Sequence, residues 1–147
     1  MKLGGTISSI LYNKGSKVWS VAGDTMVLDA IRLMSEKNVG ALPVMDKQGV
    51  AGIISERDYT RKVILKGKLS RETPVREIMS RDVVVAHPSD TVDDCMRIMT
   101  EKRIRHLPVV EGNEMVGMIS IGDLVNWVIS AQNATIEQLE QYIGYSS

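Results

Sequence analysis

Two pairs of serine and aspartate have the residue types and the spacing to bind a phosphorylated ribose. Ser55 and Asp58 are three residues apart, as are Ser120 and Asp123, and each pair stands where a strand is expected to lead into a helix. A helix N-terminus offers free N–H groups and a partial positive charge to a phosphate. A carboxylate in the first turn can accept hydrogen bonds from both hydroxyls of a ribose, and such charge-assisted contacts are stronger than neutral ones.

The same spacing also fits a structural role, the capping box that starts many helices. There the serine caps the amide three residues on, and the acidic side chain reaches back to the serine amide. The two roles are compatible for serine, whose hydroxyl can cap the helix and also contact a ligand. Each pair follows a glycine, Gly52 or Gly117, at a strand position where a missing side chain lets another backbone or a ligand come close.

The elements that carry these pairs occur twice, about 65 residues apart. Leu42-Pro43-Val44 returns as Leu107-Pro108-Val109, and Met34 returns as Met99, with no gap in the register. A repeat of this length is a unit of architecture. Each copy predicts a strand, a helix, a hairpin and a second helix, which together form a β-α-β-β-α unit.

The predicted elements follow from local patterns. Runs of β-branched residues predict strands over 18–21, 42–45, 50–55 and 83–86, and a second hairpin that turns at 111–114. Apolar residues at i, i+3, i+4 and i+7 predict helices with one apolar face, beginning near residues 27 and 92. A further helix follows each hairpin, over 56–66 and 121–132.

Two such units define the predicted domain organisation. A three-stranded sheet with two helices cannot cover both of its faces, so we expect an α+β fold in which two repeats pack sheet to sheet about a pseudo-two-fold axis. The repeats are expected to span residues 6–65 and 74–130, with a polar linker between them. Apolar residues at helical spacing predict an added amphipathic C-terminal helix over 133–145, which packs on the repeats or on another subunit.

Composition narrows the classes of function. The chain has 147 residues and a formal net charge of zero, which argues against an extended surface for nucleic acid or an anionic membrane. No apolar run approaches the roughly 20 residues of a membrane span, and the N-terminus lacks the apolar core of a signal peptide. We therefore expect a soluble cytoplasmic protein. The single cysteine, Cys95, excludes an intrachain disulfide and is expected to be an inert buried thiol.

The sequence carries no signature of catalysis or of a metal site. It has no pairing of nucleophile and base, no metal-ligand cluster and no Gly-x-x-x-x-Gly-Lys phosphate loop. We therefore expect no enzyme activity, no catalytic cofactor and no metal. Trp19 and Trp127 are expected to pack at the edges of the repeats or in a subunit interface, or, beside a cleft, to stack on a base.

The paired hairpins and the two Gly-x-x-Ser-x-x-Asp motifs resemble tandem cystathionine-β-synthase (CBS) domains, the Bateman module, over roughly residues 6–130. The resemblance implies a regulatory module that binds an adenosine-containing ligand in clefts between the repeats. AMP, ADP, ATP, NAD(H) and S-adenosylmethionine are the ligands it implies, and the motif does not separate them. It also implies a stand-alone protein that forms a disc-shaped homodimer, head to head or head to tail.

The resemblance further implies which residues contact the ligand. Ribose is expected at the two aspartates, and phosphate at the two serines. In CBS pairs the phosphate-binding side chains tend to come from the repeat opposite the ribose-binding aspartate, so Arg105 and His106 are expected to complete the Asp58 site. The matching positions of the first repeat, 38–41, carry no charge.

The remaining contacts implied by the resemblance come from one helix and from the strands. Arg57 and Arg61 are expected to supply charge to the Asp123 site, unless they belong to an ordinary solvated helix face. The adenine base is expected to lie against small and aliphatic residues: Ile7, Val21, Ala22, Ile78, Val85 and Ala86.

Three functions are therefore open. In the first, an adenosine ligand bridges the repeats and favours one arrangement of the repeats or of the dimer, which an unknown partner protein recognises. The alternative is a ligand-independent dimeric scaffold that presents an interaction surface. The third, nucleic-acid binding through the arginines of the linker and cleft, is opposed by the neutral charge.

Overall fold

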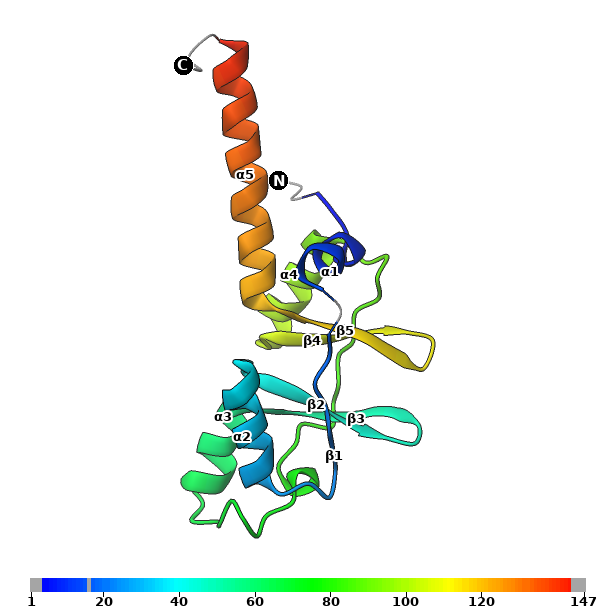
Figure 1. The fold of residues 1–147 in the computed structure, drawn as a ribbon, viewed down its shortest axis with the longest axis vertical. Coiled ribbons are helices and arrows are strands. Elements are labelled where there is room, and N and C mark those ends of the chain that lie inside the picture. Colours follow the sequence, from blue (N-terminus) through cyan, green and yellow to red (C-terminus); the bar gives the residue numbers. More distant parts are fainter. Residues whose placement is uncertain (1–3, 16, 144–147) are drawn as a thin grey trace. The chain divides into compact units, whose positions relative to one another are not determined.

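Two units, each assembled from separate stretches of sequence, make up the fold. The computed structural model describes residues 4–15 and 17–143 (Figure 1). Of these residues, unit 1 draws on 4–15, Ala86–Val109 and 117–143, and unit 2 on Lys17–Val85 and Val110–Val116. The N-terminal segment thus belongs to the unit that contains Ser120 and Asp123.

Unit 2 is built around a mixed sheet whose strands lie in the order β1-β2-β3: Val21–Ala22, Ala41–Asp46 and Gly49–Ser55. β1 runs parallel to β2, and β2 pairs antiparallel with β3. Its helical elements are α2 (Val27–Lys37), α3 (Glu56–Tyr59), the π-helical turn Thr60–Ile64 and the 3-10 turn Val75–Glu77.

The apolar face of α2 forms the centre of the unit 2 core. Val27, Ala30 and Met34 follow the helical period, and all three are buried. They pack in one cluster with apolar side chains of β2, β3 and the 3-10 turn. The helix ends at Asn38, a residue type that tolerates its left-handed backbone conformation at φ 55°.

Unit 1 combines most of β4 (His106–Glu111) and the second half of β5 (Glu114–Ser120) with three helices: α1 (Ile7–Lys14), α4 (Val92–Lys102) and α5 (Ile121–Tyr142). The turn of this hairpin, Val110–Val116, belongs to unit 2. α4 repeats the pattern of α2, with a buried apolar face and a left-handed residue, Arg103, after its last turn. Each of the five elements contributes fully buried side chains to the core, among them Ile7, Val92, Cys95, Leu107, Ile119 and Leu124.

Two short segments precede the predicted strands 18–21 and 83–86. Each of them packs in the unit that is formed mainly by the other sequence repeat. The amide of Ile7 donates to the Asp90 carbonyl at 2.9 Å, which ties the N-terminal segment to the start of α4. The amides of Ile53 and Ser80 bond each other's carbonyls at 3.0 and 2.9 Å, which ties the segment after the 3-10 turn to β3. The compact units therefore differ from the sequence repeats by an exchange of these segments and by Val110–Val116, which belong to unit 2. The bounds 6–65 and 74–130 stay a prediction.

The predicted α+β fold class is confirmed, with local differences. Residues 83–86 form no strand beyond one bridge between Ala86 and Val109. α5 is one continuous helix of 22 residues, whereas the sequence predicted a helix to residue 132 and a separate one over 133–145. Residues 144 and 145 lie outside the described part. None of the described helices is both long and apolar enough to cross a membrane. The sheet-to-sheet packing stays a prediction.

Candidate functional site

The first serine and aspartate pair forms a capping box at the junction of β3 and α3. The Asp58 amide donates to Ser55 Oγ at 3.2 Å. The amide and the hydroxyl of Ser55 donate to Asp58 Oδ2 at 2.9 and 3.1 Å. Asp58 is only 8% exposed, so its carboxylate is held in one orientation at the edge of the unit 2 core.

A lysine neutralises the Asp58 carboxylate. Lys62 Nζ lies 3.0 Å from Asp58 Oδ1, and it also donates to the Ile78 carbonyl at 2.9 Å. The ammonium group therefore bridges the helix and the segment after the 3-10 turn. A carboxylate this buried is stabilised by such a partner, because burial of a charge without one is costly.

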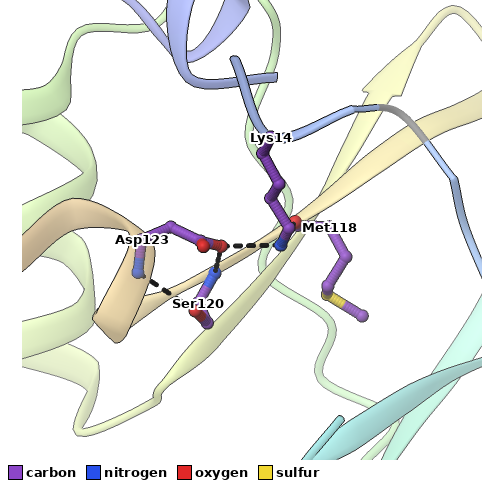
Figure 2. A network of polar contacts seen from close by, with 4 residues as sticks. All are labelled: Lys14, Met118, Ser120 and Asp123. Carbon is purple, nitrogen blue, oxygen red and sulfur yellow. Dashed lines mark hydrogen bonds and ion pairs between the residues drawn. The ribbon is translucent and has the colours of Figure 1, made fainter. Parts of the chain in front are cut away.

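The second pair forms the same capping box at the junction of β5 and α5, as Figure 2 shows. The Ser120 amide donates to Asp123 Oδ2 at 2.8 Å, and the Asp123 amide donates to Ser120 Oγ at 3.2 Å. Here the lysine comes from α1. Lys14 Nζ donates to Asp123 Oδ2 and to the Met118 carbonyl, both at 2.7 Å (Figure 2).

The two aspartates thus share one arrangement although their lysines come from unrelated places. In each unit an ammonium group bridges the carboxylate and a main-chain carbonyl. Neither lysine was predicted from the sequence to lie at a site. Lys62 had a signal, because it lies four residues after Asp58 on a helix, where opposite charges meet. Lys14 had none, since 109 residues separate it from Asp123.

His106 lies in the electrostatic field of the Asp123 site. Burial lowers the pKa of His106 below its ordinary value of 6.5, and the positive charges of Lys14 and Arg105 act in the same direction, while Asp123 opposes them. The imidazole is therefore held neutral in the folded chain at neutral pH. An anion bound beside it would favour the charged form instead.

This shift predicts a pH dependence of stability. Because the folded pKa of His106 lies below the unfolded one, the unfolded state binds more protons between the two values, and stability falls as the pH drops below 6.5. His106→Gln removes this titration. We expect the melting temperature of the variant to fall less than that of the wild type between about pH 7 and pH 5.5, measured by circular dichroism. Parallel curves for the two proteins would contradict the shift.

Each predicted phosphate-binding arginine or histidine lies in the same unit as the aspartate that is nearer to it in the sequence. Arg105 and His106 belong to unit 1, where the Arg105 carbonyl accepts a hydrogen bond from the first amide of α5 at 2.8 Å. Arg57 and Arg61 belong to unit 2 and are exposed. That each aspartate site receives its phosphate-binding side chains from the opposite repeat stays a prediction.

The residues predicted to receive adenine differ in exposure. Val21 and Val85 are half-buried and Ala22 is exposed, so these three can offer surface to a base. The side chains of the other three, Ile7, Ile78 and Ala86, are buried in the cores of their units. Their contact with adenine stays a prediction. An open pocket of about 400 Å³ in unit 2, at the β2–β3 turn, is lined by none of the predicted site residues.

Metal and thiol chemistry have little support in the described residues. In that part of the chain no group of three or more histidine, cysteine, aspartate or glutamate side chains could hold a metal ion. Burial raises the pKa of Cys95 to about 11, and Asp90 and Asp94 act in the same direction. The thiol is therefore protonated at neutral pH and lies in the unit 1 core, in agreement with the inert thiol that the sequence predicts.

Comparison with known proteins identifies the family. The CBS domain model matches residues 13–64 and 75–130, so the chain belongs to the CBS domain family and carries two CBS domains. It is 40% identical, over 94% of its length and 71% of the relative, to the CBS domain-containing protein CBSX3, mitochondrial, of Arabidopsis thaliana. A solved protein with CBS domains from Burkholderia ambifaria is 47% identical, with a TM-score of 0.82 over 86% of this chain and 95% of that one.

A third similar protein was solved with ligands bound. The CBS domain pair of protein MJ0100, in complex with 5′-methylthioadenosine and S-adenosyl-L-methionine, is 25% identical to this chain. The two share a TM-score of 0.74, over 83% of this chain and 98% of the other. Both bound molecules contain adenosine.

Proposed function

We propose that this CBS domain pair is a regulatory module that binds an adenosine-containing ligand through the carboxylates of Asp58 and Asp123. AMP, ADP, ATP and NAD(H) are the ligands we favour. The proposal is for a binding module, not an enzyme. The cytoplasmic location and the homodimer predicted from the sequence remain part of the proposal.

The observation that carries the proposal is the matched geometry of the two aspartates. Each carboxylate is held by the amide of its serine in the first turn of a helix, and each is neutralised by a lysine ammonium. A fixed carboxylate is suited to two hydroxyls of a ribose, and a ribose that displaces the ammonium leaves a mobile positive charge beside the ligand. The adenosine ligands of the MJ0100 pair support the same chemistry in a related fold.

Such binding acts as a signal only if the ligand prefers one arrangement of the two domains. A ligand shifts a conformational equilibrium by its difference in affinity for the two states, and by no more than that. We infer that a partner protein recognises the favoured state.

A thermal-shift panel tests the proposal. At 100 times its dissociation constant, a ligand that binds only the folded state stabilises it by about 2.7 kcal/mol. We expect a rise in melting temperature with at least one of AMP, ADP, ATP, NAD⁺, NADH and S-adenosylmethionine, and none with inosine at the same concentration. No rise with any adenosine ligand would overturn the proposal.

One observation favours the second candidate, a ligand-independent scaffold. Both oxygens of Asp58 already have partners within unit 2, and Asp123 is paired with Lys14, so neither carboxylate needs a ligand to be stable. A scaffold shows no thermal response to any adenosine ligand, so the same panel separates the two functions.

Lys14 is expected to control the preference for phosphorylated ligands. When ribose takes its place at Asp123, the ammonium can pair with a ligand phosphate, whereas adenosine gains nothing from it. In Lys14→Gln we expect the ratio of AMP affinity to adenosine affinity to fall about tenfold, the equivalent of 1.4 kcal/mol. Calorimetric titration with both ligands measures the ratio.

A lysine away from the site provides the control. Lys102 ends α4 and is exposed, so Lys102→Gln removes the same charge without touching Asp123. The ratio should stay at the wild-type value in this variant. An equal loss of affinity for AMP and adenosine in Lys14→Gln would show that Lys14 supports the fold of the site and does not select for phosphate.

A further inference from the structure

α5 and the residue that follows it, Ile143, carry an exposed row of mainly apolar side chains at heptad spacing. Its members are separated alternately by four and three residues, and we call them the α5 seam: Val125, Ile129, Gln132, Ile136, Leu139 and Ile143. The five apolar members are 43–58% exposed. A regular alternation of three and four is the spacing of a coiled coil, in which every member faces the partner helix.

Unit 1 packs against a different face of α5. Leu124 is fully buried, and the Trp127 indole N–H donates to the Gly4 carbonyl at 3.2 Å. At about 100° per residue, these two side chains lie roughly a quarter-turn or more round the helix from the seam. The packing of α5 on its own unit therefore leaves the seam uncovered.

The second half of α5 has no support from the rest of the described chain. Every residue from 132 to 141 is exposed, and Figure 1 shows this half extending beyond the other elements of unit 1. A short helix without packing partners is marginal in water, because its stability comes mainly from burial of an apolar face. A partner for the seam would provide that burial.

We propose that the α5 seam pairs with the same seam of a second copy of this chain, as a parallel two-stranded coiled coil. The residue types favour this occupant. Isoleucine fills the a positions, 129, 136 and 143, and Leu139 fills a d position, a combination that favours two parallel strands. Gln132 at the d position between them is a polar core residue of the kind that fixes register at some cost in stability.

The charges beside the seam are compatible with a second copy. Among the described e and g positions from 126 to 140, Glu140 is the one charged residue. In a parallel pair each g position faces the next e position of the other helix, so Glu140 faces Thr135 of the second copy and no two carboxylates meet. The seam spans fewer than three heptads, so we expect the dimer to dissociate on dilution.

Sedimentation equilibrium tests the seam with a matched pair of variants. Ile136→Glu with Leu139→Glu places two carboxylates in the seam, whereas Gln138→Glu with Gln141→Glu adds the same charges to the outer c and f positions of the same turns. We expect the seam variant to have half the molecular mass of the wild type and of the outer variant at high concentration, because it loses the association through the seam. A seam variant with the same mass as the wild type would overturn the proposal.

Interchain disulfide formation tests the parallel register. In Gln132→Cys the two new thiols meet across the seam, so mild oxidation should cross-link the dimer, whereas Gln138→Cys on the outer face should not. Cys95 is buried and its pKa is about 11, so it does not compete. Equal cross-linking of the two variants, or none in Gln132→Cys, would exclude a parallel seam.

The coiled-coil proposal and the ligand-binding proposal can be tested separately. The seam side chains are exposed in the single chain, so the seam variant should keep the circular dichroism spectrum of its CBS domains and the wild-type thermal response to AMP. Loss of the dimer with an unchanged response to AMP is the expected result. If the seam variant lost both the dimer and the circular dichroism spectrum of the folded domains, the seam side chains would be needed for the fold and would not form a free surface.

Discussion

Replacing Asp58 by alanine is expected to weaken the binding of an adenosine ligand at unit 2 by about 10 to 100 fold. Hydrogen bonds to a charged group contribute about 1.5–3 kcal/mol, and each 1.4 kcal/mol is a factor of ten in affinity. The same substitution at Asp123 should have an effect of similar size at unit 1. Isothermal titration calorimetry with AMP, ATP and NAD⁺ measures both.

The stability of the variant needs its own control, because Asp58 also belongs to a capping box. Loss of a helix cap costs about 0.5–2 kcal/mol. Thr91→Ala is a matched control, since the Thr91 hydroxyl oxygen caps α4 by accepting the Asp94 amide at 3.1 Å and has no part in the proposed site. It should lose stability and keep its affinity. Unchanged affinity in Asp58→Ala would exclude a ribose contact there.

Gly52→Ala is expected to cause the largest loss of stability of any single methyl group added to the strands. A Cβ on Gly52 would lie 2.6 Å from Met79 Sδ and 2.8 Å from the Ser80 carbonyl oxygen. Met79 can move, but Ser80 is fixed by its two backbone bonds to Ile53. Overpacking of this kind costs about 1–3 kcal/mol, which lowers the melting temperature by about 3–10 °C in thermal unfolding.

Alanine substitutions at two other glycines provide a comparison for this loss of stability. In Gly117→Ala the new methyl group meets Leu11 Cδ2 at 2.5 Å, a side-chain end that can rotate, so we expect a smaller loss. Gly122 lies in the first turn of α5, where a Cβ meets Ser120 Oγ at 3.6 Å, an ordinary contact. Alanine there should be neutral or stabilising, because it is the better helix former. A Gly52→Ala protein as stable as Gly122→Ala would show that the segment after the 3-10 turn does not press on β3.

The glycines also show where the sequence was informative. The pattern identified Gly52 and Gly117 as points of close approach, and this is confirmed, with Met79 and Ser80 as the neighbours of Gly52 and Leu11 as the neighbour of Gly117. A missing side chain in a strand reveals that something lies close. It does not reveal what, because the neighbour comes from a distant part of the chain.

The fold class was predictable because it depends on local periodicity and on the repeat. The apolar faces of α2 and α4 and both capping boxes lie within a few residues of the signals that predict them. The placement of α1 was not predictable. It depends on backbone bonds such as that from Ile7 to Asp90, which any polar backbone could form and no side-chain pattern marks. Lys14 reaches Asp123 only as a consequence of that placement.

Strand propensity was the weakest guide. Residues 83–86 are as β-branched as any strand of the chain, yet one bridge at Ala86 is all that they form. Propensity in a strand reflects packing against neighbours more than an intrinsic backbone preference. The amides of Ile7 and Ser8 bond the carbonyls of Asp90 and Pro88, so α1 holds the chain that follows Ala86.

The central claim is that an adenosine ligand binds at the two Ser-x-x-Asp carboxylates. The most direct measurement is carboxyl ¹³C NMR of aspartate-labelled protein titrated with AMP, with Asp58 and Asp123 assigned by Asp→Asn variants. We predict saturable shifts of one or both of these signals, as ribose hydroxyls replace the lysine ammonium groups, while the exposed carboxyl of Asp29 stays unchanged. Signals of Asp58 and Asp123 that do not move at millimolar AMP, ATP and NAD⁺ would contradict the claim.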